Sequence, residues 1–240
     1  MQESGDEGPI EMGRLATGHR AALAREPKQD RSRASFERVL DAATELLAEK
    51  GYSEFTLQEL SRRSTVSIGS IYCRVSGKDD LIRLVQVRVL DRLDVEQAGF
   101  INRLRRQELP LRELVPETVI QFGRFLRKNA SILRAFMELG ANDPVAGEVG
   151  RAHFDKALLD FRLLLLEHRS EIKHMDPDHA VDACFNMVYA SLCRYLGLGT
   201  MGDVVGEGNW DQLLEDLSLM ALFFLLGDPR QVRAKTARSG

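Results

Sequence analysis

Apolar residues recur every three or four positions along most of the chain, and polar residues fill the positions between them. This spacing is typical of helices that bury one face, whereas a half-buried strand alternates apolar and polar residues one by one. Stretches of such alternation between turn residues are nearly absent from the sequence. The pattern therefore predicts an all-α fold.

Gly, Pro and polar turn residues divide the chain into expected helices. A first helix is expected over residues 32–50, because Gly51 stands where a C-terminal cap belongs. Pro110 and Pro116 are expected to break the segment that follows residue 106 near its start. After two short helices, the expected segments are 78–106, 119–128, 131–139, 145–172, 177–198 and 210–226.

The two short helices lie between residues 56 and 77 and are marked by their caps. Thr56 is suited to cap the first, because Glu59 three residues later can return a bond to the Thr56 amide. Ser67 holds the equivalent position before the second helix, eleven residues further on. That distance leaves room for about two turns of helix between the caps. The geometry is a helix-turn-helix, whose second helix can enter a major groove.

The chain is expected to contain a small N-terminal domain over residues 31–77 and a larger helical domain over 78–228. Residues 1–30 have few apolar anchors and change from acidic to basic, which predicts a disordered arm, and 229–240 a flexible tail. A basic arm can lie along phosphates, although a solvated tail without a role is the alternative. The helix from Lys78 begins in the first domain and leaves it, so it is expected to link the two mechanically.

Composition narrows the class of protein. The formal net charge of −3 argues against coating of nucleic acid by bulk electrostatics, so any such binding needs a local cationic face. Three Cys without ligand-like spacing fit a reducing cytoplasm better than a disulfide scaffold. The longest apolar run, Leu219 to Leu226, is too short to span a bilayer. We therefore expect a cytoplasmic protein without a membrane partner.

The last two long helices carry a signal for self-association. Ala183, Ala190 and Gly197 repeat every seven residues, which allows close helix approach. The C-terminal half of the final helix is apolar nearly all round. A terminal helix with two apolar faces needs two partners, namely its own core and, most simply, a copy of itself. The expectation is a homodimer through these two helices, and the alternative is a helix buried inside a monomer.

The block from about Val39 to Leu81 resembles the TetR family of transcriptional regulators. The family pattern is met by Gly51, Tyr52, Thr56, Gly69, Ser70, Tyr72, Lys78 and Asp79. The chain departs from it at Ser64-Thr65, where Ala-Gly is usual, and Thr65 then predicts strain in a left-handed turn. The resemblance implies a ligand-responsive regulator, expected to be a repressor, that binds a near-palindromic operator as a homodimer and is released by a small-molecule effector.

The resemblance also implies a division of roles on double-stranded DNA. Phosphate contacts fall to Thr56, Ser70, Tyr72 and Lys78. Base edges fall to Ile68, Gly69, Cys73 and Arg74. Arg74 is the residue suited to a bidentate contact with guanine, although a phosphate contact is its alternative. For Tyr72 the alternative is a place in the core.

An effector cavity in the larger domain is implied by the resemblance, with an apolar or aromatic ligand preferred. The candidate lining residues are Phe122, Phe125, Met137, Phe154, Phe161, Phe185, Met187 and Tyr189. Each of them equally suits an ordinary helical core.

Two rival functions remain open. A metal-dependent or small-molecule-processing enzyme is suggested by His174, Asp176, Asp178 and His179. However, Asp176 and Pro177 already suit a helix start, and no third partner for an open site is evident, so no metal or cofactor is expected. A helical adaptor that has lost DNA binding is the second rival, because Thr65 and Val75 depart from the family pattern.

Overall fold

The protein is described here by a computed structural model that covers residues 15–199 and 208–227, with side chains from residue 32 onward. This part of the chain forms helices and turns alone, so the all-α prediction is confirmed. The helices are α1 (Leu15–Lys50), α2 (Leu57–Ser64), α3 (Ile68–Tyr72), α4 (Lys78–Arg106), α5 (Leu111–Asn142), α6 (Pro144–Leu166), α7 (Pro177–Leu196) and α8 (Trp210–Leu226). None of the described helices is long and apolar enough to cross a membrane.

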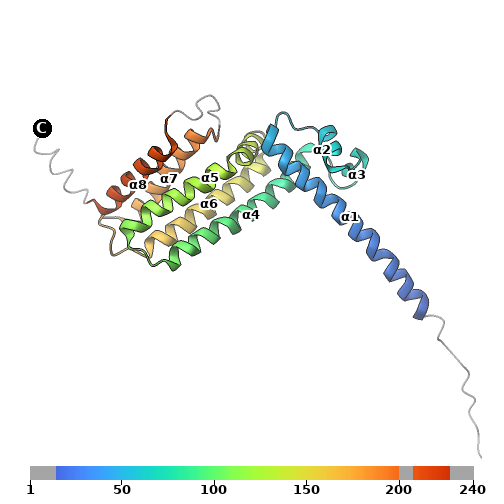
Figure 1. Ribbon diagram of the computed structural model, residues 1–240, viewed down its shortest axis with the longest axis horizontal. Helices are drawn as coiled ribbons and strands as arrows, with labels where there is room; N and C mark the ends of the chain where they lie inside the picture. The colour runs from blue at the N-terminus through green and yellow to red at the C-terminus, as the bar shows by residue number, and fades with distance from the viewer. Residues whose placement is uncertain (1–14, 200–207, 228–240) are drawn as a thin grey trace, which may run out of the picture.

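The helices form two groups (Figure 1). Helices α2 and α3 pack beside α1 at one end of the molecule, and the rest of α1 projects away from it. Helices α4, α5 and α6 run lengthwise side by side, and α7 and α8 cover the far part of this bundle. The long helix α4 reaches from the small group into the bundle, as the sequence predicted.

The start of α1 and the end of α6 differ from the expected boundaries. Helix α1 begins at Leu15, so residues 15–30 have helical backbone where a disordered arm was expected. This segment contains four Ala, two Leu and two Arg, which favour helix. Helix α6 ends at Leu166 rather than residue 172. The arm residues 1–14, most of the Gly-rich loop and the predicted tail lie outside the described residues.

Helix α5 is continuous where two helices were expected. Pro116 is only the sixth residue of α5, so its missing N–H removes a single hydrogen bond, to the Arg112 carbonyl, close to the helix start. Residues 128–131 include neither Gly nor Pro, so nothing stops the helix between the two predicted segments. The resulting helix is 32 residues long and runs the length of the bundle.

The caps of the two short helices form as predicted. Thr56 accepts a hydrogen bond at Oγ1 from the Glu59 amide, 3.3 Å away, and Ser67 accepts one at Oγ from the Ser70 amide, 3.2 Å away. The expected return bond from the Glu59 side chain does not form. That carboxylate instead accepts hydrogen bonds from Arg62 and Arg63 at 2.6 and 3.0 Å. Charged donors one turn away hold it more strongly than a neutral amide would.

Contacts at the start of α4 join it to α1 and the loop that follows α1. Lys78 Nζ donates to the Tyr52 carbonyl oxygen at 2.8 Å, and Tyr52 Oη donates to Asp79 at 2.9 Å. About three turns further along α4, Arg88 pairs with Asp41 of α1 at 2.7 Å. Leu84 of α4 is 45% exposed, because it lies off the buried stripe that contains Leu81, Ile82 and Val85.

Aromatic side chains fill the core of the bundle. The Phe122 ring lies 4.6 Å from Phe161 and 5.5 Å from Phe185, measured between centroids. Helices α5 and α8 approach closely at Gly123, where a Cβ would lie 2.4 Å from a Leu214 methyl. The core therefore joins α5, α6, α7 and α8 into one packed unit.

The turn between α2 and α3 has the strain that its sequence predicted. Thr65 adopts φ 55° and ψ 30°, a left-handed conformation that β-branched residues rarely take. Its hydroxyl donates to the Ser64 carbonyl at 2.7 Å.

Replacing Thr65 with Asn is expected to stabilise the protein by about 0.5–1 kcal/mol, because Asn tolerates the left-handed region better than a β-branched residue. Chemical denaturation followed by circular dichroism measures the change. Thr65→Val keeps the β-branch and is the control, for which no gain is expected. Equal stabilities for the Asn variant and the original chain would show that the turn carries no such strain.

Candidate nucleic-acid interface and ligand cavity

The outward side of α3 and its flanking residues carries small and polar groups. Ile71 and Val75 are buried in the apolar core, while Ile68 is half-buried. The predicted contact residues that stand exposed are Thr56, Gly69, Ser70, Tyr72, Cys73 and Arg74. Tyr72 is 52% exposed, so its alternative place in the core is wrong.

Two cations beside α3 are held by neighbouring groups. The Lys78 ammonium lies 4.4 Å from the centre of the Tyr52 ring, in addition to its hydrogen bond to the Tyr52 carbonyl. An ammonium has three donors, so this arrangement leaves donors for an anionic oxygen. Arg74 hydrogen-bonds Ser32 and lies 5.2 Å over the Phe36 ring, both in α1. The predicted guanine contact would require Arg74 to leave α1.

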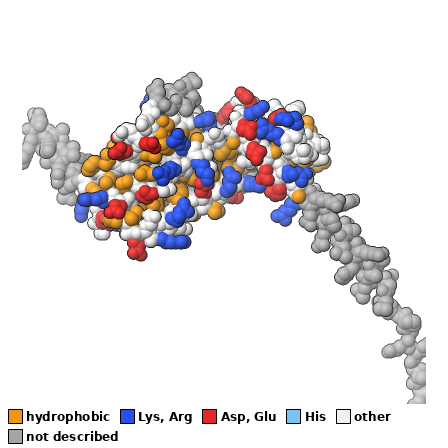
Figure 2. All heavy atoms as spheres, in the orientation of Figure 1, with side chains coloured by type: hydrophobic (Ala, Val, Ile, Leu, Met, Phe, Trp, Pro, Cys, Tyr) orange, Lys and Arg blue, Asp and Glu red, His pale blue; other side chains and the backbone are white. Residues whose placement is uncertain are grey.

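Ion pairs limit the positive field of this end of the molecule. Figure 2 shows acidic and basic side chains close together over α1, α2 and α3. Hydrogen bonds from Arg62 and Arg63 lower the pKa of Glu59 to about 2, so this carboxylate stays charged beside them. Arg63 also pairs with Glu49 at 2.6 Å. Anion binding here depends on a few placed groups rather than on a general excess of cations.

A cavity of about 330 Å³ lies between α4, α5 and α6, with Tyr189 of α7 at its wall. This volume is at the lower end of the range for small-molecule sites, roughly 300–1,000 Å³. Five of the eight predicted lining residues face it, namely Phe122, Phe125, Met137, Phe154 and Tyr189. The same cavity is lined by residues that sequence reasoning missed, including Gln86, Leu90, Gln97, Gly140 and Gly147.

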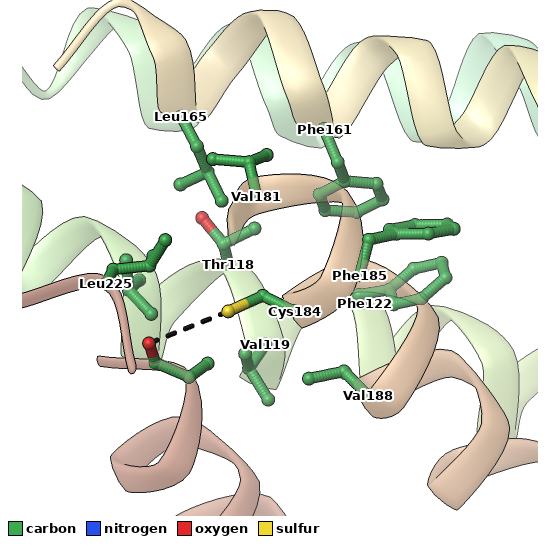
Figure 3. A pocket seen from close by; sticks show the side chains of 12 residues that line it. Thr118, Val119, Phe122, Phe161, Leu165, Val181, Cys184, Phe185, Val188 and Leu225 are labelled. Carbon is green, nitrogen blue, oxygen red and sulfur yellow. Dashed lines mark hydrogen bonds between the residues drawn. The ribbon is translucent and has the colours of Figure 1, made fainter. Parts of the chain in front are cut away.

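Two other predicted residues, Phe161 and Phe185, line a separate void of about 30 Å³ (Figure 3). Its walls come from α5, α6, α7 and α8, and Cys184 Sγ donates to the Ala221 carbonyl at 3.7 Å beside it. This void is too small for an organic molecule. Met187 is 45% exposed and lines neither space.

The missed glutamines had a signal in the sequence. Gln86 and Gln97 interrupt the apolar stripe of α4 at positions in phase with Leu90 and Leu93. Both side chains are only 1% exposed. A polar residue on a buried helix stripe indicates a specific partner or a site, because burial of an unpaired amide is costly.

Comparison with known sequences gives matches to the part of the chain that contains the helix-turn-helix. The sequence model of the family described as "Bacterial regulatory proteins, tetR family" matches residues 39–85, from the second half of α1 into α4. The HTH-type transcriptional regulator HbdR of Aromatoleum sp. (strain CIB) is 38% identical over 58 residues, 24% of this chain and 25% of that protein. The match thus spans a quarter of the length of this curated relative.

Solved structures share the fold of most of the chain. A protein from Mesorhizobium loti MAFF303099 assigned to the TetR family has a TM-score of 0.66 at 17% identity, over 81% of this chain and 96% of that one. The regulator FadR of Bacillus subtilis, solved in complex with stearoyl-CoA, has a TM-score of 0.54 at 17% identity, over 78% of this chain and 97% of that one. Residues 39–85 are thus similar in sequence to the TetR family, and most of the chain shares the fold of these solved structures. The resemblance predicted from Val39 to Leu81 is therefore confirmed.

The residues of the suggested metal cluster are engaged in other contacts. Asp176 caps α7 by accepting from the His179 amide at 3.1 Å, and Asp178 pairs with Arg162 at 2.8 Å. His174 bonds to the backbone of Asp176 at 3.0 Å. Within residues 15–199 and 208–227, no group of three His, Cys, Asp or Glu side chains is arranged to hold a metal ion.

The three thiols are expected to differ sharply in reactivity. Burial raises the pKa of Cys184 to about 12 and that of Cys193 to about 11, so both are protonated thiols at pH 8, whereas Cys73 is exposed. Iodoacetamide at pH 8 should therefore label the native protein at Cys73 alone, as read by mass spectrometry. Labelling in denaturant is the control and should modify all three. Rapid native labelling of Cys184 would contradict the packing of α7 against α8.

Proposed function

We propose that this protein is a ligand-responsive transcriptional regulator of the TetR family, acting as a repressor. In this proposal it binds a near-palindromic operator as a homodimer and is released when a small molecule occupies the cavity. The observation that carries the proposal is the course of α4, which starts at the helix-turn-helix and forms a wall of the cavity. Because its fold relatives are regulators, we infer that it is not an enzyme.

We propose that Thr56, Ser70, Tyr72 and Lys78 hold DNA phosphates, while Ile68, Gly69 and Cys73 face base edges. The exposure of the capped helix α3 supports this assignment, since its small residues permit close approach to the groove floor. Arg74 joins the base contacts if DNA draws it away from Ser32 and Phe36. Salt-dependent binding of operator DNA distinguishes this regulator from the alternative, a helical adaptor that has lost DNA binding.

We propose that the dimer forms through α7 and α8. Leu219, Met220 and Phe223 of α8 are 44%, 60% and 68% exposed, and Met187 of α7 is 45% exposed. Figure 2 shows hydrophobic side chains gathered over the α8 part of the bundle. Pairing of this surface with its copy would bury it in a four-helix interface.

The connection from cavity to DNA is proposed to run through the first turns of α4. Arg83 of α4 pairs with Asp143, the N-cap of α6, and also with Asp80. Asp80 in turn accepts from the Ser76 amide at 3.1 Å, in the loop after α3. A ligand that favours one position of α6 against α4 thereby changes the placement of α3, provided that it binds the two arrangements with different affinity.

Replacing Gly69 with Ala tests the DNA-facing surface without disturbing the fold. A Cβ at Gly69 meets nothing within 4 Å, so the variant should fold and gain about 0.5–1 kcal/mol of helix stability. Affinity for the DNA upstream of its own gene should fall about tenfold in a gel shift, because the methyl group blocks close approach. Gly99→Ala in α4 is the matched control, with only an ordinary contact at 3.6 Å. Equal affinity for both variants would place Gly69 away from DNA.

Replacing Phe223 with Glu should convert the dimer to a monomer, since a carboxylate at the centre of an apolar interface loses its hydration. Light scattering after size-exclusion chromatography measures the mass. Val95→Glu is the matched control, because Val95 is an apolar residue of α4 that is 74% exposed. A Phe223→Glu protein that stays dimeric would rule out α8 as the centre of the interface.

A further inference from the structure

Two buried glutamines of α4 present unpaired acceptors at the cavity. Gln86 Nε2 donates to the Ala146 carbonyl at 3.0 Å, and Gln97 Nε2 donates to Asp160 Oδ2 at 3.0 Å. Both partners accept hydrogen bonds only, so the NH₂ end of each amide must face them. The Oε1 atoms of both glutamines are buried and have no partner in the described part of the chain.

An unpaired buried carbonyl calls for a donor. Nearly all buried polar groups in proteins are paired, with protein or with water. The two glutamines line a space large enough for ordered water, which can satisfy them when the cavity is empty. A ligand that displaces this water gains affinity only if it supplies the donor itself.

The cavity touches α4 from Gln86 to Gln97, and most of its lining residues are apolar. Gln86 and Gln97 are eleven residues apart, which is roughly 16 Å along a helix. The end at Gln86 is lined by Gly140 and Gly147, and Phe125 contributes to the aromatic wall. An apolar body with a polar group at one end matches this arrangement.

The charges around the cavity favour an uncharged ligand. Asp94 pairs with His153 at 2.6 Å and with Lys156 at 3.3 Å, and Asp160 lies 3.6 Å from Lys156. The Lys156 ammonium therefore lies close to both carboxylates. A ligand carboxylate would face the glutamine lone pairs, although Arg151, an exposed lining residue, makes an acid the rival ligand.

We propose that the effector is an uncharged, elongated molecule with an aromatic or other apolar body and an N–H or O–H group that donates to Gln86 or Gln97. The regulatory role of this molecule rests on the proposed function, whereas its binding in the cavity does not. The proposal separates this site from one built for fatty acids, whose ionised head group has no donor.

Indole and benzofuran test whether the ligand must supply a donor. They have nearly the same shape, but indole has a ring N–H where benzofuran has a ring oxygen. Isothermal titration of the full chain should give an affinity for indole about tenfold higher than for benzofuran. The double variant Gln86→Met/Gln97→Met keeps the side-chain length and should bring this ratio close to one. Gln107→Met, at the exposed end of α4, is the control and should keep it. Decanoate is the acidic probe and should bind more weakly than indole.

Four results would overturn the proposal: equal affinity for the two heterocycles, binding of neither, a ratio unchanged in the folded double variant, or tighter binding of decanoate. Circular dichroism establishes that the variants are folded. The proposed function is judged separately, by whether saturating indole weakens operator binding in the gel shift. Indole that binds through the glutamines but leaves the DNA complex intact would count against ligand-responsive repression and not against the ligand chemistry.

Discussion

The attachment of α4 to the helix-turn-helix is the constraint on which the rest of the structure depends. Lys78 donates a hydrogen bond to the Tyr52 carbonyl in the loop after α1, and the Tyr52 hydroxyl donates one to Asp79. From this point α4 continues for 29 residues, about 43 Å, and lines the cavity on its way. One helix therefore belongs to both domains. A displacement of its first turns cannot leave α3 in place unless these contacts break.

Polar contacts, and not apolar packing alone, set the position of α6 against α4. Gln86 of α4 donates a hydrogen bond to the Ala146 carbonyl of α6, and Arg83 of α4 pairs with Asp143. The hydrogen bond from the Ala146 amide, with help from Arg83, lowers the pKa of Asp143, so the carboxylate stays charged at the N-terminus of α6. Such contacts favour one register between the two helices, and a change of rotamer at Arg83 or Gln86 would release it.

Features that depend on neighbouring residues could be predicted from the sequence, and features that depend on distant ones could not. The caps Thr56, Ser67 and Asp176 bond within three residues of themselves, so their helix starts were predictable. Arg74 was expected at DNA, but its partner Ser32 lies 42 residues away. The glutamine partners are about 60 residues from Gln86 and Gln97. The aromatic residues predicted a cavity wall, but which of them line the cavity and which line the small void depends on how the helices pack.

The helices around the cavity differ in how easily they can move apart, and this difference decides which helix responds to a ligand. At the junction of α5 and α6, a Cβ on Gly147 would lie 3.1 Å from the Gly140 carbonyl oxygen, so the two backbones are almost as close as they can be. That end cannot contract further. Across the cavity, α4 meets α6 through side chains that can change rotamer, such as Arg83 and Gln86. Space for a ligand is therefore made most easily by moving α4 against the α5–α6 pair, and Gln86 is only eight residues, about 12 Å, from Lys78.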